Sequence, residues 1–381
     1  MYLKNQKIKS FFASIIVFSI LFSSFVFKAK AKDLPPFEEL SLGSSVFIFR
    51  GSTKKPQFNS NSTRYVKRSY TSRKLKKSRR TSKKSVANRR KKPSTKKSVS
   101  RKPQTVSTKP KPTETDSTKV ETLFDKAVEN YNQGRYEEAI ATYKQVIALD
   151  ATHPDAHANL AGAYRQLERY AEANGEYKFA AEYIKDDTDL FSEWGYCLGK
   201  VDEWTKAVAR LQTAKELEAD AINYANVGWG YLNAAQKNIS ENNTAEARAN
   251  FLQAKEFLQK AIALYPQLVA AFLNLGVVYN GFGEPEKAVE ILTKANSART
   301  NWLTAINELG VAYRQSNNLA AAIIQFQKAV SIDDKFAVGY FNLGEAQVKS
   351  GKKDEARKTL EKLKKLDKDL ATQLEKIINK P

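Results

Sequence analysis

Small and apolar residues recur at helical spacing between residues 119 and 366, and the pattern repeats along the chain. In its first copy, Gly134 stands where one helix must end, Ala139 marks a close crossing of two helices, and Tyr143 and Val146 lie on the apolar stripe of the second helix. The crossing alanine returns at one constant interval in two series: Ala139, Ala173 and Ala207, then Ala288, Ala322 and Ala356. This sustained period predicts an all-α chain of stacked helix pairs, because one pair alone cannot bury its apolar face.

The first helix of the copies carries a second repeated feature, a small residue followed three positions later by an aromatic residue. Gly276 with Tyr279 and Gly310 with Tyr313 show it, whereas Gly344 lacks the aromatic partner. Three segments carry the pattern most clearly: AGAYRQLERYAEANGEY (161–177), LGVVYNGFGEPEKAVEIL (275–292) and LGVAYRQSNNLAAAIIQF (309–326). They resemble the tetratricopeptide repeat family, whose period is about 34 residues. The resemblance implies a solenoid of about seven helix pairs that ends in a C-terminal capping helix.

The third copy departs from the lettering of that family at Trp194, Leu198 and Trp204. It keeps the small residue Gly195 and the crossing residue Ala207. We therefore expect the same helix pair in this copy.

The fourth copy contains an insertion. The interval from Gly228 to Ala254 is more than twice the interval from the equivalent Gly195 to Ala207. The difference is about 14 residues, which is roughly two extra turns for each helix. We expect an elongated helical hairpin with a polar tip at 242–244, where Thr244 could cap the second helix.

The ends of the repeat region are predicted from helix caps. Ser117 or Thr118 is the first plausible cap after a proline-rich stretch, so the repeat domain is placed at residues 117–381. A last helix from Asp369 to Asn379 is expected to cover the open end, with Leu370, Leu374 and Ile377 directed inward.

Charge divides the chain into two parts. Residues 1–119 hold 31 of the 63 Lys and Arg and 5 of the 41 Asp and Glu, a net charge of +26. The remaining residues, 120–381, have 32 basic and 36 acidic residues, a net charge of −4. The whole-chain net charge of +22 therefore comes from the N-terminal part.

The first 31 residues read as an export signal. Lys4, Lys7 and Lys9 precede an uncharged run at 11–27, and the A-x-A pattern at 29–31 predicts cleavage after Ala31. The apolar run is slightly shorter than the roughly 20 residues of a comfortable membrane span. An exported protein, periplasmic or secreted, is the first prediction, and an uncleaved membrane anchor is the alternative.

The segment 32–50 contains the β-prone run Val46 to Phe49 between Gly43 and Gly51. It could form a short strand or an adhesive peptide. Both possibilities stay open on the sequence alone.

The next segment, 51–116, is expected to be a disordered, basic linker. Residues 51–112 hold 23 Lys and Arg and no Asp or Glu, with many Ser, Thr and Pro. Its densest basic residues are Lys74, Lys76, Lys77, Arg79, Arg80, Arg89, Arg90, Lys91 and Lys92. Such an arm suits a polyanion such as nucleic acid, an anionic lipid or a cell-wall polymer, through salt-sensitive binding. A solvated spacer is the alternative.

The family resemblance also implies a concave surface lined by the first helix of every pair. One position of that helix is polar in all copies: Asp125, Asn159, Glu193, Asn226, Asn274, Glu308 and Asn342. Asparagine can donate to and accept from a main-chain amide, so this row is expected to bind an extended peptide. The alternative is that asparagine is simply common at this position in the family and has no binding role. Tyr196 and Trp229, three positions further along, are candidate anchors for an apolar side chain, although core packing would explain them as well.

The two carboxylates in that row, Glu193 and Glu308, favour a basic peptide. The basic arm itself, represented by residues 64–84, is therefore a possible intramolecular occupant. A clamp for a C-terminal carboxylate is disfavoured, because no lysine occupies the preceding position of the row in any copy.

Catalysis, metal binding and cofactor binding find little support. His153 and His157 are the only histidines, and no third ligand follows in reach of them. The single cysteine, Cys197, lies in a repeat helix and reads as a packed apolar residue. The GFGEP sequence at 281–285 sits at a helix turn and has no preceding strand, so it does not fit a phosphate loop.

The sequence thus predicts a non-enzymatic interaction scaffold of the cell envelope, with no cofactor and no metal. The alternative is a polyanion-binding or nucleic-acid-binding protein that acts through the arm and uses the repeats for oligomerisation.

Overall fold

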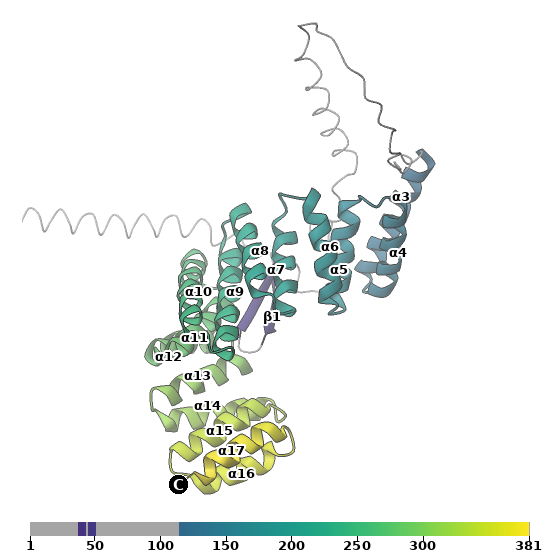
Figure 1. Cartoon of the computed structure of the whole chain (residues 1–381). Coiled ribbons are helices and arrows are strands. Elements are labelled where there is room, and N and C mark those ends of the chain that lie inside the picture. Colours follow the sequence, from purple (N-terminus) through teal and green to yellow (C-terminus); the bar gives the residue numbers. More distant parts are fainter. Residues whose placement is uncertain (1–36, 43–44, 51–113, 381) are drawn as a thin grey trace, which may run out of the picture. The chain divides into compact units, whose positions relative to one another are not determined.

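The computed structural model describes residues 37–42, 45–50 and 114–380 (Figure 1). The chain divides into two compact units: one within residues 54–185, and one that joins residues 1–53 to residues 186–381. The predicted export signal and the named residues of the basic arm lie outside the described residues.

In the smaller unit, the structure describes two helix pairs: α3 (Glu114–Asn132) with α4 (Tyr136–Leu149), and α5 (Pro154–Gln166) with α6 (Tyr170–Tyr183). The predicted cap at Ser117 or Thr118 is wrong, because α3 already begins at Glu114. Thr118 lies inside this helix, where its main-chain carbonyl accepts a bond from the Thr122 hydroxyl at 2.9 Å.

The larger unit contains the other helices. They are α7 (Thr188–Lys200), α8 (Trp204–Leu217), α9 (Ala221–Ser240), α10 (Thr244–Leu264), α11 (Val269–Phe282), α12 (Pro285–Ala298), α13 (Leu303–Gln315), α14 (Leu319–Ile332), α15 (Ala337–Lys349), α16 (Lys353–Leu363) and α17 (Lys368–Asn379). Within the unit each pair contacts the next, and α17 contacts both α15 and α16. The described helices thus make seven pairs and a terminal helix, as predicted.

The turn inside every described pair contains one residue with left-handed backbone. These residues are Gly134, Glu168, Asp202, Asn242, Gly283, Asn317 and Gly351, with φ between 58° and 80°. Glycine adopts this conformation without steric cost, and a polar residue accepts it at modest cost. The GFGEP sequence is therefore a helix turn, with Gly283 ending α11 and Pro285 beginning α12.

Small residues allow the two helices of a pair to approach closely. The crossing alanines are fully buried, as Ala288 of α12 shows. A Cβ atom added at Gly276 of α11 would lie 2.4 Å from the Leu292 side chain of α12. The third copy follows the same geometry, because an added Cβ at Gly195 would lie 2.7 Å from Leu211. The constant spacing of the small residues therefore reflects the close packing of the two helices in each pair.

The predicted insertion is present as an elongated pair. The helices α9 and α10 are 20 and 21 residues long, and the turn between them contains Asn242 and Asn243. The prediction that Thr244 caps α10 is wrong: Asn243 occupies the cap position, and its side chain makes no cap bond.

The terminal helix α17 has its apolar face close to the predicted one. Leu374 is fully buried, while Leu370 and Ile377 are only partly buried. Ala371 and Ile378 are buried as well, so the buried face lies about one residue further along the helix than predicted.

The β-prone segment forms a strand. Strand β1 (Phe37–Leu42) pairs antiparallel with β2 (Ser45–Arg50), with Leu42 opposite Ser45 and Phe37 opposite Arg50. Strand β2 contacts α7, α9 and α11, all first helices of their pairs (Figure 1). Residues 45–49 are buried, so this N-terminal strand is part of the core of the larger unit.

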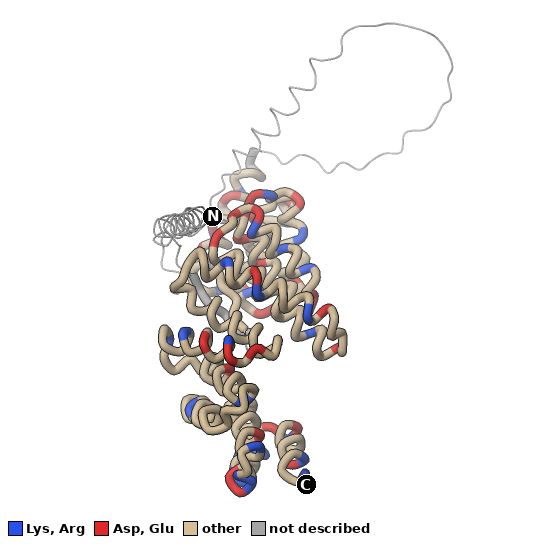
Figure 2. The backbone as a smooth tube through the Cα atoms, turned by 90° about the vertical axis from the view of Figure 1, so that its left-hand side faces the viewer, with Lys and Arg blue, Asp and Glu red and all other residues tan. Residues whose placement is uncertain are grey.

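Residues of both charge signs are interspersed along the described helices (Figure 2). This matches the near-neutral balance of residues 120–381. No helix in the described part of the chain combines the length and apolar character of a membrane span.

Candidate functional site

Two asparagines on neighbouring first helices hold the β2 strand by its main chain. The Asn226 amide of α9 donates to the carbonyl of Ile48 at 2.6 Å and accepts from the Ile48 N–H at 2.9 Å. The Asn274 amide of α11 does the same with Val46, at 2.7 and 2.8 Å. Each amide therefore replaces one residue of a neighbouring strand, and β2 is hydrogen-bonded to β1 on its other edge.

The spacing of these bonds follows from strand geometry. Successive residues that face the same edge of a strand are two positions apart, which is about 6.6 Å. Val46 and Ile48 are such a pair, and they bond to consecutive repeats. An extended segment bound by these asparagines therefore advances two residues per repeat. Its N-to-C direction is opposite to the order of the helices along the chain, because Val46 bonds to α11 and Ile48 to α9.

The side chains of β2 are buried on both faces. Val46 and Ile48 belong to the apolar core formed by α9, α11 and their neighbours, where they join residues such as Ala225 and Leu273. Phe47 lies on the other face, with ring centroids 4.8 Å from Trp229 and 5.0 Å from Tyr196.

Two further contacts extend the aromatic side of the groove. Phe49 lies 4.8 Å from Tyr196, measured between ring centroids. Ser45 exchanges hydrogen bonds with the Asn233 amide of α9, at 3.1 and 3.0 Å. Asn233 and Ser45 were not singled out by the sequence analysis. The sequence offers one signal for Asn233: it follows Trp229 by one helical turn and therefore lies on the same face of α9.

The groove is defined by Tyr196, Asn226, Trp229, Asn233 and Asn274. Among the predicted site residues, the structure brings together Asn226, Asn274, Tyr196 and Trp229 around β2. None of these four is more than 3% exposed. They can bind a main chain by paired amide bonds and an aromatic side chain by ring contacts.

The other predicted members of the polar row have different neighbours. Asn342 of α15 donates to Asn307 of α13 at 3.0 Å. Asn159 of α5 lies in the smaller unit near Tyr143, whose pKa is raised chiefly by burial, and the buried Asn159 Nδ2 has no hydrogen-bond partner among the described residues. Asp125 of α3 is exposed, and Glu193 of α7 is half-buried. The Asn342 bond thus joins the first helices of two neighbouring pairs.

Glu308 of α13 is buried beside Asn280 of α11. The Asn280 amide donates to the Glu308 carbonyl at 3.0 Å and to its carboxylate at 3.1 Å. Arg314 lies near this carboxylate and forms an ion pair with Glu345. Burial lowers the pKa of the Arg314 guanidinium, and the Glu308 charge opposes that shift.

At Asn226 and Asn274, the occupant differs from the predicted one. The charge pattern favoured the basic segment 64–84, which lies outside the described residues, whereas the strand that bonds to these amides is 45–50. The aromatic walls explain the difference, because Phe47 gains ring contacts there whereas a lysine or arginine would lose hydration.

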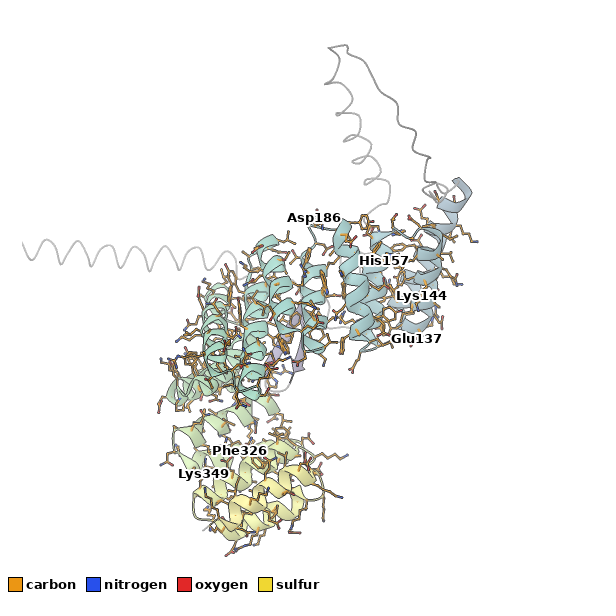
Figure 3. All side chains as sticks on the ribbon, viewed as in Figure 1. Glu137, Lys144, His157, Asp186, Phe326 and Lys349 are labelled. Atoms are coloured by element: carbon orange, nitrogen blue, oxygen red, sulfur yellow. The ribbon has the colours of Figure 1, made fainter. Side chains whose placement is uncertain are left out.

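Both histidines make contacts with other residues of the smaller unit. His153 accepts from the Ala156 N–H at 3.2 Å and stacks on Phe124. His157, labelled in Figure 3, bonds to Glu176 at 2.5 Å. Among the described residues, no group of three His, Cys, Asp or Glu side chains is placed to hold a metal.

The comparisons with known proteins agree with this helical architecture. Residues 129–168 and 310–351 match a family model described as a TPR repeat, and residues 337–370 match one described as a tetratricopeptide repeat. A tetratricopeptide repeat protein from Parabacteroides merdae aligns with 69% of this chain and 100% of its own, at 15% identity and a TM-score of 0.55. One chain in the crystal structure of the APC/C hetero-tetramer Cut9–Hcn1 aligns with 70% of this chain and 55% of its own length, at 15% identity and a TM-score of 0.52.

One curated protein is similar in sequence, a probable UDP-N-acetylglucosamine–peptide N-acetylglucosaminyltransferase SPINDLY of Hordeum vulgare. It is 26% identical over 99 residues, which is 24% of this chain. The chain spans about a tenth of the length of that relative. The structural similarities show the fold alone, and the family matches identify the repeats. The chain therefore contains tetratricopeptide repeats at residues 129–168 and 310–370, within a helical solenoid of the same fold.

Proposed function

We propose that this protein is a non-enzymatic interaction scaffold whose groove binds an extended segment of another protein by its main chain. The observation that supports this most strongly is the pair of amides, Asn226 and Asn274, that each bond to both polar groups of one strand residue. Main-chain bonds tolerate many sequences, and the aromatic wall of Tyr196 and Trp229 adds selectivity for an aromatic side chain. In this proposal, β2 occupies the place of the partner segment.

The proposal predicts that a peptide copy of β2 enters the groove when the chain's own strand is weakened. In the full chain, Phe47→Asp places a charge between Tyr196 and Trp229 and should release β2. A labelled peptide of residues 43–55, titrated into this variant and followed by fluorescence anisotropy, is expected to bind. Adding Asn226→Ala and Asn274→Ala should weaken binding at least about tenfold, since four hydrogen bonds are lost.

The wild-type chain is the control, because its own strand should compete with the peptide. Helix content measured by circular dichroism shows whether the variants stay folded, and Phe47→Ser is the milder replacement if Phe47→Asp does not. Peptide binding that is equal with and without the two asparagines would contradict the proposal, as would no binding at all.

We further propose that the protein acts in the cell envelope, exported through the signal at residues 1–31 or anchored by it. In this proposal, the basic arm concentrates the scaffold at a polyanionic surface. The charge contrast of +26 for residues 1–119 against −4 for residues 120–381 supports that role. The same contrast favours the second candidate function, polyanion or nucleic-acid binding through the arm with the repeats as an oligomerisation module.

The arm proposal predicts strongly salt-dependent binding. Replacing the nine basic residues between Lys74 and Lys92 named above with glutamine should weaken binding of the full chain to heparin and duplex DNA. It should also lower the slope of log affinity against log salt by several units, because each neutralised phosphate contributes about 0.9 for DNA. The matched control replaces nine exposed helix lysines, including Lys144, Lys206 and Lys294, and should change little. Equal losses in both variants would contradict an arm-specific role.

A further inference from the structure

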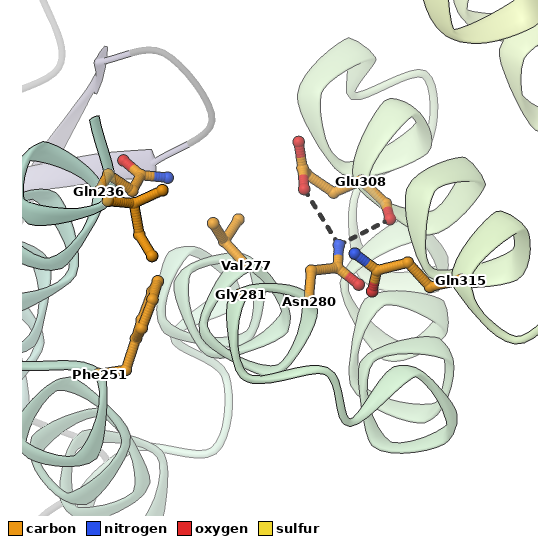
Figure 4. Close-up of a pocket in the computed structure, with 8 residues that line it drawn as sticks. Gln236, Phe251, Val277, Asn280, Gly281, Glu308 and Gln315 are labelled. Atoms are coloured by element: carbon orange, nitrogen blue, oxygen red, sulfur yellow. Dashed lines mark hydrogen bonds between the residues drawn. The ribbon is translucent and has the colours of Figure 1, made fainter. Parts of the chain in front are cut away.

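A pocket of about 320 Å³ lies next to the groove, between α9, α10, α11 and α13 (Figure 4). One side is apolar and consists of Ile239, Phe251 and Val277, and the other is polar and consists of Asn280, Glu308 and Gln315. Its volume is at the lower end of the roughly 300–1,000 Å³ of small ligand pockets. It suits one long side chain that is apolar along its length and polar at its tip.

The insertion in the fourth repeat contributes one residue to the apolar wall of this pocket. Ile239 lies in the last turn of the lengthened α9, beyond the end of an ordinary first helix. Phe251 reaches the pocket from α10 and lies over Gly281 of α11, where an added Cβ would be 2.4 Å from the ring. The elongated pair and Gly281 together place an aromatic ring beside the concave surface.

The polar wall holds a buried hydrogen-bond acceptor. Asn280 is 7% exposed, and its Nδ2 group is used by the two bonds to Glu308. These bonds fix the amide, and its Oδ1 atom has no hydrogen-bond partner among the described residues. A buried oxygen in this position is stabilised by a donor from a ligand, because an unsatisfied acceptor is costly. The Glu308 carboxylate beside it favours a donor with positive charge, even with Arg314 nearby.

The register of β2 points to the residue that would reach this pocket. Phe47 faces Trp229 of α9, and Ser45 faces Asn233 one helical turn later. The next residue on the same face of a strand is two positions earlier, and the pocket-lining Gln236 follows Asn233 by another turn. In a partner segment that continues as a strand, a side chain at this position would reach the pocket. In the sequence of this chain, the residue two positions before Ser45 is Gly43.

Resting on the proposed function, we propose that the pocket binds an arginine or lysine side chain of the partner segment, two residues before the serine that faces Asn233. The aliphatic stem lies against Ile239, Phe251 and Val277. The charged head donates to Asn280 Oδ1 and to the Glu308 carboxylate. The partner is thus an extended segment with a basic residue followed, four positions later, by an aromatic residue.

The test uses three labelled peptides of residues 43–55 with glycine, arginine or glutamate at position 43, titrated into the full-length Phe47→Asp chain. The arginine peptide is expected to bind about tenfold tighter than the glycine peptide, and the glutamate peptide more weakly than both. Glu308→Gln should reduce the advantage of arginine to about twofold or less and leave the glycine peptide unchanged. The matched control is Glu345→Gln on α15, which removes a nearby carboxylate that does not line the pocket.

The outcomes separate the two proposals. If all three peptides bind with equal affinity, the groove binds peptides and the pocket proposal is wrong. If the advantage of arginine survives Glu308→Gln but not Glu345→Gln, the site is misassigned and the pocket proposal is also wrong. If no peptide binds, the proposed function fails first. Should Phe47→Asp not fold, the Phe47→Ser chain gives the same ranking under the proposal.

Discussion

Replacing Asn226 and Asn274 together with alanine is expected to release β2 from the groove while the helices remain folded. The change removes four hydrogen bonds to Val46 and Ile48. At about 0.5–1.5 kcal/mol each, the loss is about 2–6 kcal/mol, and leaving main-chain groups buried without partners adds to it. Hydrogen exchange should show this directly, since protection of the Val46 and Ile48 amides should fall by a factor of about 30 or more.

The matched control is Asn342→Ala, because Asn342 belongs to the same row but donates to Asn307 instead of β2. It should leave the exchange of the β2 amides unchanged. If the double variant kept its protection, the paired amide bonds would not be what holds the strand.

Phe47→Ala is expected to have an effect of similar size on the side-chain face of the strand. Phe47 is fully buried, and three aromatic rings lie within 5.0 Å of its ring, measured between centroids. Truncating a buried phenylalanine costs about 3–5 kcal/mol. We expect the near-ultraviolet circular dichroism of the Tyr196 and Trp229 surroundings to change and the β2 amides to exchange faster.

Ile324→Ala on α14 is the control, since that side chain is 60% exposed and should contribute less than about 0.5 kcal/mol. A second check is the coupling between the two faces of the strand. Once Phe47→Ala has released β2, adding the two asparagine changes should cost little more. If the losses in stability were fully additive, the amide bonds and the ring contacts would hold the strand independently of each other.

The repeated architecture could be predicted because it depends on local sequence. The constant spacing of the alanines records the helix crossings, and the enlarged distance from Gly228 to Ala254 gave the long pair with its turn at Asn242. Helix starts were less predictable. Thr118 has the chemistry of a cap but lies inside α3, because a favourable cap residue does not prevent a helix from beginning earlier.

The site could be predicted only in part, because its occupant comes from a distant place in the chain. The row of polar residues pointed to Asn226 and Asn274, and the apolar run at 46–49 pointed to a strand, but nothing in either pattern connects them. Glu308 and Asn342 share the position of the two asparagines, yet each bonds to a neighbouring helix. Whether an amide in this row faces a ligand or another side chain depends on the adjacent helices, which one position of the sequence does not specify.

The pairing of β2 with α9 and α11 has a consequence for the newly made protein. The bonded residues are 178 and 228 positions apart, so the strand leaves the ribosome long before its groove exists. At about 5–20 residues per second, that interval is about 10–50 s. Throughout it, the run from Val46 to Phe49 is an unburied, β-prone segment of the kind that aggregates. The next residues to emerge, 51–112, carry 23 positive charges and no negative ones. Charge beside an apolar strand opposes aggregation, so we expect this stretch to keep nascent chains apart until translation has completed the groove.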